Sequence, residues 1–146
     1  MMNAYKSFFV GVALLGFGAA AQADDGKAYT LGTVTAVSFI KTKPGKFNEY
    51  MKYLDTTYKA IMEGLKKEGL IVGYHIYDSV PKTPHDPDLI LTVTYTNMAA
   101  LDKVDERDAV TGKIAGSLEA RDKSSAEREA LRESLGGDLI RELILK

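Results

Sequence analysis

LIVGYHIYDSV at residues 70–80 and LILTVTYT at residues 89–96 flank the segment PKTPHDPD at residues 81–88. Both flanks are rich in β-branched and aromatic residues, which are typical of strands. Pro81, Pro84 and Pro87 stiffen the connection between them. The stretch therefore predicts two strands joined by a loop, and the other elements of the chain are expected to pack against this pair.

A further strand is predicted at residues 32–41, GTVTAVSFIK, where β-branched residues recur throughout. Apolar groups fall on both of its faces, as expected for a central strand that is covered on two sides. Residues 24–31 are polar and are expected to form a short tail. Lys43-Pro44-Gly45 then ends the strand and opens a helix.

That helix is predicted over residues 46–68, because apolar side chains recur there at spacings of three and four. Lys66 and Lys67 lie near the negative end of the helix dipole, and Gly69 can form the C-terminal cap. Such a stripe is expected to pack against a sheet. Its members are Phe47, Tyr50, Met51, Leu54, Tyr58, Ile61 and Leu65.

The helical pattern returns over residues 97–135, where Asn97 can cap the first turn. Gly112 and Gly116 weaken helix propensity by about 1 kcal/mol each, so a break or bend is expected there. Residues 119–134 are highly charged, with a mixed charge pattern that is typical of a solvated face. After Gly136 and Gly137, the segment DLIRELILK at residues 138–146 predicts a final strand with apolar groups on both faces.

The predicted element order is strand, helix, strand, strand, helix, strand, which is the ferredoxin-like βαββαβ arrangement of the α+β class. Its helices would cover one face of a four-stranded sheet and leave the other open. An open apolar face of that size predicts a homodimer that packs sheet against sheet. The residues expected on the open face are Val37, Phe39, Ile71, Tyr77 and Ile90.

The N-terminus predicts a secretory signal peptide at residues 1–23. Lys6 supplies a positive charge, an apolar run broken by glycines follows, and Ala21-Gln22-Ala23 is a small-x-small cleavage site. Cleavage after Ala23 would leave one domain at residues 24–146, periplasmic or secreted. The apolar run is too short for a membrane span, so no membrane association is expected after cleavage.

Composition excludes several classes of site. The chain has no cysteine, which rules out thiol catalysis, zinc–thiolate sites and iron–sulfur clusters. With 19 basic and 20 acidic residues, the formal net charge is −1. That near-balance provides no electrostatic reason to expect nucleic-acid binding.

Several stretches resemble the dimeric α+β barrel superfamily, which includes the antibiotic-biosynthesis monooxygenase-like and NIPSNAP-like domains. They run from VTAVSFIKTKPGKFNEYMKYL through LIVGYHIY and DLILTVTY to LIRELIL, and include a strand-KPG-helix opening and an N-x-x-A-L helix directly after the third strand. The resemblance covers most of residues 24–146. It implies the barrel architecture but no single chemistry, because one fold hosts many functions.

Family members that oxidise aromatic compounds without a cofactor resemble one another in placing Asn, Tyr, Trp and His around the barrel cavity. This chain has no Trp. The resemblance therefore supports a partial set, in which His75 accepts a proton and Tyr77 orients a phenolic or carbonyl oxygen. Thr92, Thr94 and Thr35 would line the same cavity. Alternatively, His75 and the threonines form a hydrogen-bonded interface between protomers.

Other candidate ligands are weaker. His85, Asp86 and Asp88 stand in one loop, but Pro87 constrains it and aspartate beside proline is ordinary turn chemistry, so no metal site is expected. Haem-degrading relatives present an axial histidine from a helix, and neither predicted helix contains one, so no cofactor is expected. An inward Arg141 could bind a carboxylate ligand or form a salt bridge between protomers.

Two functions follow from these observations. The first is a small-molecule binding protein or a cofactor-independent monooxygenase-like enzyme that uses His75 and Tyr77. The second is a non-catalytic structural or interaction protein whose sheet face serves only homodimerisation.

Overall fold

A computed structural model describes residues 26–146, so the predicted signal peptide at 1–23 lies outside the described residues. The elements within the described range alternate as the sequence predicts, with one long helical run between the first two strands. They are β1 (Tyr29–Thr42), α1 (Phe47–Tyr53), the π-helical turn η1 (Leu54–Tyr58), α2 (Lys59–Lys67), β2 (Gly73–Asp78), β3 (Leu89–Tyr95), the 3₁₀ turn η2 (Met98–Asp102), α3 (Val104–Ala115), α4 (Leu118–Glu129) and β4 (Arg132–Leu145).

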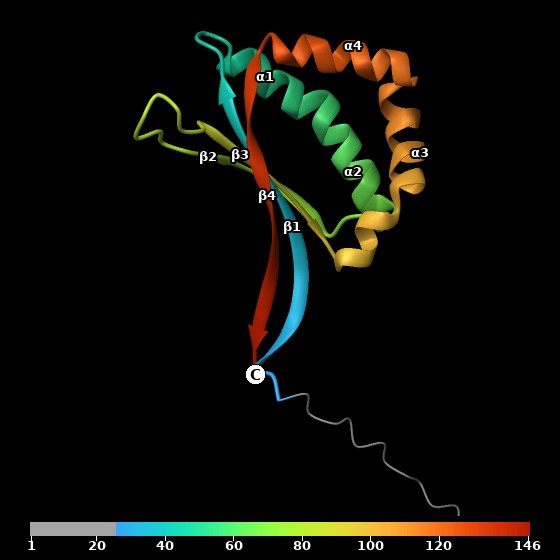
Figure 1. Cartoon of the computed structure of the whole chain (residues 1–146). Helices are drawn as coiled ribbons and strands as arrows, with labels where there is room; N and C mark the ends of the chain where they lie inside the picture. Colours follow the sequence, from blue (N-terminus) through green and yellow to red (C-terminus); the bar gives the residue numbers. More distant parts are fainter. Residues whose placement is uncertain (1–25) are drawn as a thin grey trace, which may run out of the picture.

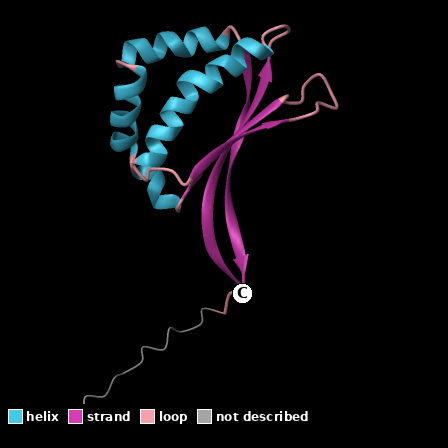
Figure 2. Ribbon diagram, turned by 180° about the vertical axis from the view of Figure 1, so that it is seen from behind, coloured by secondary structure: helices cyan, strands magenta, loops and turns pink. Residues whose placement is uncertain are grey.

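The strands form one antiparallel sheet in the order β2-β3-β1-β4. All helices lie on one side of it, with α1 and α2 next to the sheet and α3 and α4 further out (Figures 1 and 2). The predicted ferredoxin-like α+β fold is thereby confirmed. None of the helices between residues 26 and 146 has both the length and the apolar character needed to cross a bilayer.

The helical run from Phe47 to Lys67 buries most of the apolar stripe that its periodicity predicts, but Phe47, at the start of α1, is 40% exposed. Tyr50 and Leu54 join Ile40, Leu89 and Leu91 in one core cluster between helix and sheet. A second cluster forms around Leu65, Leu70 and Ile71 at the end of α2. Gly69 follows the helix with a φ of 67°, a left-handed conformation that glycine adopts without steric cost.

Ile71 is therefore not on the open face, where the alternation of residues 70–77 predicts it. Its side chain is 4% exposed and belongs to the core. The reason is that β2 begins only at Gly73, so the chain still turns at Leu70 and Ile71 and strand alternation does not apply to them. Val72, expected on the core side, is instead 48% exposed.

The first and last strands of the chain, β1 and β4, are longer than predicted. β1 already begins at Tyr29, inside the expected polar tail, and β4 begins at Arg132, six positions before the expected Asp138. The two pair with each other from Tyr29 and Leu145 to Thr42 and Arg132, whereas β3 reaches β1 only from Val34 onward. The far ends of β1 and β4 thus form a two-stranded arm that projects beyond the helices (Figure 1).

The second helical region breaks at Gly116, between α3 and α4, where its φ is 84°. Asn97 caps η2 through its side-chain oxygen, which accepts from the amide of Ala100 at 3.1 Å. The glycine-based break and this cap both match the sequence prediction. Neither α3 nor α4 contributes a fully buried residue, so both helices dock through partly exposed side chains.

Candidate functional site

The candidate site lies on the sheet face that the helices leave uncovered. His75 of β2 pairs with Thr92 of β3, and Thr92 pairs in turn with Val37 of β1. Paired residues of antiparallel strands project from the same face. Leu91, the residue before Thr92 in β3, is buried against the helices. Successive strand residues face opposite sides, so His75, Thr92 and Val37 project from the face that the helices leave uncovered.

Five of the six predicted site residues share this open face. The rings of His75 and Tyr77 are 5.9 Å apart between centroids, and both side chains are exposed. The hydroxyls of Thr35 and Thr94 lie 3.0 Å apart in a hydrogen bond across β1 and β3. Thr92 stands between these two pairs, opposite His75. The face thus offers an imidazole, a phenol and three hydroxyls from three neighbouring strands.

Arg141 does not join this group. It pairs with Val34, which is fully buried, and so it projects toward the helix side of the sheet. On the open face the neighbouring position is Glu142, whose carboxylate accepts a hydrogen bond from the hydroxyl of Thr33 at 3.1 Å. This part of the open face therefore carries a carboxylate and not a guanidinium group.

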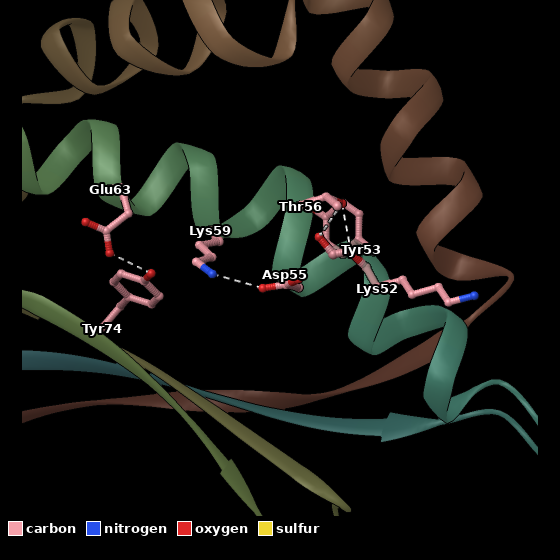
Figure 3. A network of polar contacts seen from close by, with 7 residues as sticks. All are labelled: Lys52, Tyr53, Asp55, Thr56, Lys59, Glu63 and Tyr74. Atoms are coloured by element: carbon pink, nitrogen blue, oxygen red, sulfur yellow. Dashed lines mark hydrogen bonds and ion pairs between the residues drawn. The ribbon is translucent and has the colours of Figure 1, made fainter.

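Part of this group of side chains also borders a hollow at the free edge of the sheet, which is formed by β2. A hollow of about 670 Å³ borders β2 and is lined by His75 and Thr94 on the open face and by Glu63 and Lys66 on α2. On the helix side of β2, the Tyr74 hydroxyl donates to the Glu63 carboxylate at 2.8 Å (Figure 3). The same helix carries an ion pair between Lys59 and Asp55, at 3.0 Å, beside this contact.

Three tyrosines on the helix side of the sheet are poor candidates for proton acceptors. Burial raises the pKa of Tyr58 well above its ordinary value and also raises that of Tyr50, where the nearby Arg132 guanidinium partly opposes it. The pKa of Tyr74 is raised by burial and by its hydrogen bond to Glu63. All three phenols therefore remain protonated near neutral pH, so none of them is a phenolate that could take up a proton.

The loop between β2 and β3 is organised by its own carboxylates. Asp86 accepts from the amides of Lys82 and Thr83 at 3.0 and 2.8 Å, and these backbone hydrogen bonds lower its pKa. Asp88 accepts from the amide and hydroxyl of Thr42 and so ties the loop to β1. His85 is exposed, and no three potential metal ligands gather anywhere in residues 26–146.

The structure also assembles a group that sequence reasoning missed. The pattern of residues 119–134 predicts a solvated face, yet three of its arginines turn inward. Arg128 lies over the ring of Tyr53 at 5.3 Å, and Arg132 lies over Tyr50 at 5.9 Å. The two rings stack on each other with centroids 5.9 Å apart and an angle of 15° between planes.

One signal in the sequence could have indicated this arrangement. Arg121 and Arg128 are seven positions apart, which places them on the same face of a helix, toward which the small Ser124 also points. A helix with so few apolar residues can dock only through the stems and flat faces of such long side chains. Charge alone therefore did not distinguish the docked face of α4 from its solvated face.

Comparison of the sequence with protein-family models and with curated proteins returned no match. Solved structures do resemble the chain. HapK from Hahella chejuensis superimposes with a TM-score of 0.51 at 10% identity, covering 75% of this chain and 91% of HapK. Protein SO0527 from Shewanella oneidensis also gives a TM-score of 0.51, at 15% identity, covering 80% of this chain and 98% of that protein. At such identities the likeness shows a shared ferredoxin-like fold and nothing further.

Proposed function

We propose that this protein is an exported homodimer of the dimeric α+β barrel type, which binds a small molecule at its sheet face beside His75 and Tyr77. The observation that carries the proposal is the uncovered sheet face. Tyr77 is 50% exposed and Ile140 is 53% exposed, while Val37, Phe39 and Ile90 are only partly covered. Exposed apolar area of this extent is typical of a protein–protein interface.

The arm formed by β1 and β4 supports the same assembly. Leu31, Leu143 and Leu145 are 61%, 54% and 81% exposed, and Ile144, on the opposite face of the arm, is 48% exposed. A two-stranded ribbon has little stability by itself in water. A second copy that packs sheet against sheet about a two-fold axis would cover the open face together with Ile140 and Ile144, which lie on the same side of β4.

The polar groups on this face favour a neutral or weakly polar ligand that carries a carbonyl or phenolic oxygen. His75 and Tyr77 can each exchange one hydrogen bond with such an oxygen, and Thr92 stands beside them. A facing sheet would exclude water and strengthen these bonds. Proton transfer by His75 to or from a bound phenol would be the simplest chemistry at this site, because an imidazole can both donate and accept a proton.

The alternative is that the face serves dimerisation only. One observation favours it: the hydroxyls of Thr35 and Thr94 already hydrogen-bond to each other and need no ligand. Under that alternative His75 and Tyr77 would pack against the partner's sheet without space between them.

Dimerisation is tested by light scattering coupled to size-exclusion chromatography. We expect a dimer at micromolar concentration, and a monomer for Ile140→Asp, because a buried unpaired carboxylate is costly at an apolar interface. Leu118→Asp is the matched control: this leucine is 68% exposed but lies on α4, on the helix side. A wild-type monomer at that concentration would exclude the barrel assembly.

Ligand binding is tested by a thermal-shift screen of small phenols and aromatic ketones, because a ligand that binds the folded state raises Tm. Any compound that raises Tm should lose this effect in His75→Ala and Tyr77→Phe variants that remain dimeric. If His75→Ala weakens the dimer but leaves every ligand effect intact, the dimerisation-only alternative is correct. Export is tested separately, by fractionating cells that express the full chain and sequencing the N-terminus of the product.

A further inference from the structure

A second cavity, of about 140 Å³, lies on the other side of the molecule, between the inner and the outer helices. It is lined by residues of the α1–α2 run, of α3 and of α4, and Figure 1 shows these helices side by side. No residue of the sheet borders it among the described residues, so it is separate from the site beside His75. The side chains on which its chemistry depends are Tyr53, Thr57, Ile61, Thr111, Arg121 and Arg128.

The two arginines of this cavity are incompletely paired. Arg128 donates from Nη1 to the Tyr53 hydroxyl at 3.1 Å, and Arg121 donates from Nη1 to Asp108 at 3.3 Å. The Nε atoms of both are buried, and residues 26–146 offer neither of them an acceptor. A buried donor without a partner costs free energy, more so when it carries charge. The Nη2 groups of both arginines make no hydrogen bond within residues 26–146 and are not fully buried, so an oxyanion in the cavity would accept from them.

The charges around the cavity indicate an anion of single charge. Arg121 and Arg128 bring two positive charges, and Asp108, itself 61% exposed, offsets one of them. Arg132, which lies nearby over Tyr50, is accompanied by Glu129 at 3.9 Å. Within residues 26–146, Arg128 therefore forms no ion pair, and it lies in a partly buried place where screening by solvent is weak.

The helix beside the cavity departs from regular geometry at this point. Residues 54–58 form a π-helical turn between α1 and α2, directly after Tyr53 and including Thr57. Single π-helical turns inside α-helices occur frequently at functional sites, because they redirect side chains at a small cost in stability. Here the turn lies between Tyr53 of α1 and Ile61 of α2 and itself contributes Thr57, so that all three residues line the cavity.

Size and lining limit the ligand. A cavity of this volume holds about six non-hydrogen atoms, by comparison with cavities that admit one benzene ring. Ile61 and Ala115 provide an apolar wall opposite the guanidinium groups. A planar carboxylate fits the planar donor fork of arginine better than a bulkier tetrahedral anion does in so small a space. We propose that this cavity binds a small monocarboxylate, with its carboxylate on Arg121 and Arg128 and its short alkyl chain against Ile61.

The probe for this site is sodium propionate, and propionamide is its uncharged counterpart of the same shape. We expect propionate, at constant ionic strength, to raise Tm and to shift the NMR amide signals of Thr57, Thr111 and Ser124. Propionamide should do neither. Arg128→Lys keeps the charge but loses Nε and the planar fork, so it should weaken propionate binding by about tenfold or more.

Lys123→Met is the matched control, because it removes one positive charge from the exposed side of the same helix, α4. It should bind propionate as the wild type does. Circular dichroism shows whether the Arg128→Lys variant is folded; Arg121→Lys provides the same test if it is not. Equal effects of propionate and propionamide, amide shifts that map elsewhere, or equal affinities of Arg128→Lys and Lys123→Met would each overturn the proposal.

Discussion

Replacing Tyr53 by phenylalanine removes a single oxygen atom from the contact that holds α4 against α1. The hydroxyl lies 3.1 Å from Arg128 Nη1, and without it that donor has no other partner among the hydrogen bonds of the described residues. A hydrogen bond to a charged group contributes about 1.5–3 kcal/mol when it is buried, and this one is only partly buried. We therefore expect the free energy of unfolding to fall by about 1–2 kcal/mol.

Tyr53→Leu should cost more, because it also removes the ring. The guanidinium of Arg128 lies 5.3 Å from the ring centroid, and the stacked ring of Tyr50 lies 5.9 Å away. A cation–π contact contributes about 0.5–2 kcal/mol and an aromatic pair about 0.5–1.5 kcal/mol. The leucine variant should thus lose roughly 1–3 kcal/mol beyond the phenylalanine variant.

Urea unfolding followed by circular dichroism measures these differences, since the chain has no tryptophan for fluorescence. For a domain of this size, 1 kcal/mol corresponds to about 4 °C in Tm. Tyr77→Phe is the matched control: its ring is 50% exposed on the open face and far from α4. If Tyr53→Phe and Tyr77→Phe both unfold within about 0.5 kcal/mol of the wild type, the arginine–tyrosine contacts do not anchor α4.

Three further changes test other parts of the structure. Leu54→Ala should lower the free energy of unfolding by about 2–5 kcal/mol in urea titrations, because Leu54 is 1% exposed in the main core cluster; a loss below 1 kcal/mol would place it outside the core. Gly137→Ala should lower the free energy of unfolding by about 1–3 kcal/mol, since the new methyl group would collide with the carbonyl oxygen of Val37. Gly112→Ala has open space in α3 and should raise the free energy of unfolding by about 0.5–1 kcal/mol. Similar effects of the two substitutions would contradict this reasoning. The pKa of Asp86 is lowered in the folded protein, so the contribution of its carboxylate to loop order is present above pH 4 and is lost as the pH falls through the lowered pKa. The NMR amide shifts of Lys82 and Thr83 should titrate over this pH range in the wild type and not in Asp86→Asn.

The local sequence was sufficient to predict those elements that pack one face against a single neighbouring element. The stripe that contains Tyr50, Leu54 and Leu65 predicts both the helix and its buried side, because a helix beside a sheet needs one apolar face. The alternation in residues 73–78 likewise places His75 and Tyr77 on one face. Gly69 and Asn97 marked their helix ends, since the backbone geometry they permit is set by the residue itself.

Ile71 and Arg141 show where local alternation misleads. Ile71 lies before β2 begins, and its burial depends on how the turn after α2 meets the sheet. Arg141 could face either side by alternation alone, and its pairing with Val34 selected the helix side. Pairing register is a contact between residues distant in sequence, so no local pattern specifies it.

By itself the sequence determined the α+β class, the order of the elements and the face that carries His75, because these follow from side-chain periodicity within single segments. Only the tertiary structure decided the length of the β1–β4 arm, since each strand is extended by its partner's backbone hydrogen bonds. Only it brought Arg121 and Arg128 together with Tyr53 around a cavity. The physical reason is that charged side chains are expected in solvent unless other elements offer them partners, and here the neighbouring helices supply the ring of Tyr53 to Arg128 and the carboxylate of Asp108 to Arg121.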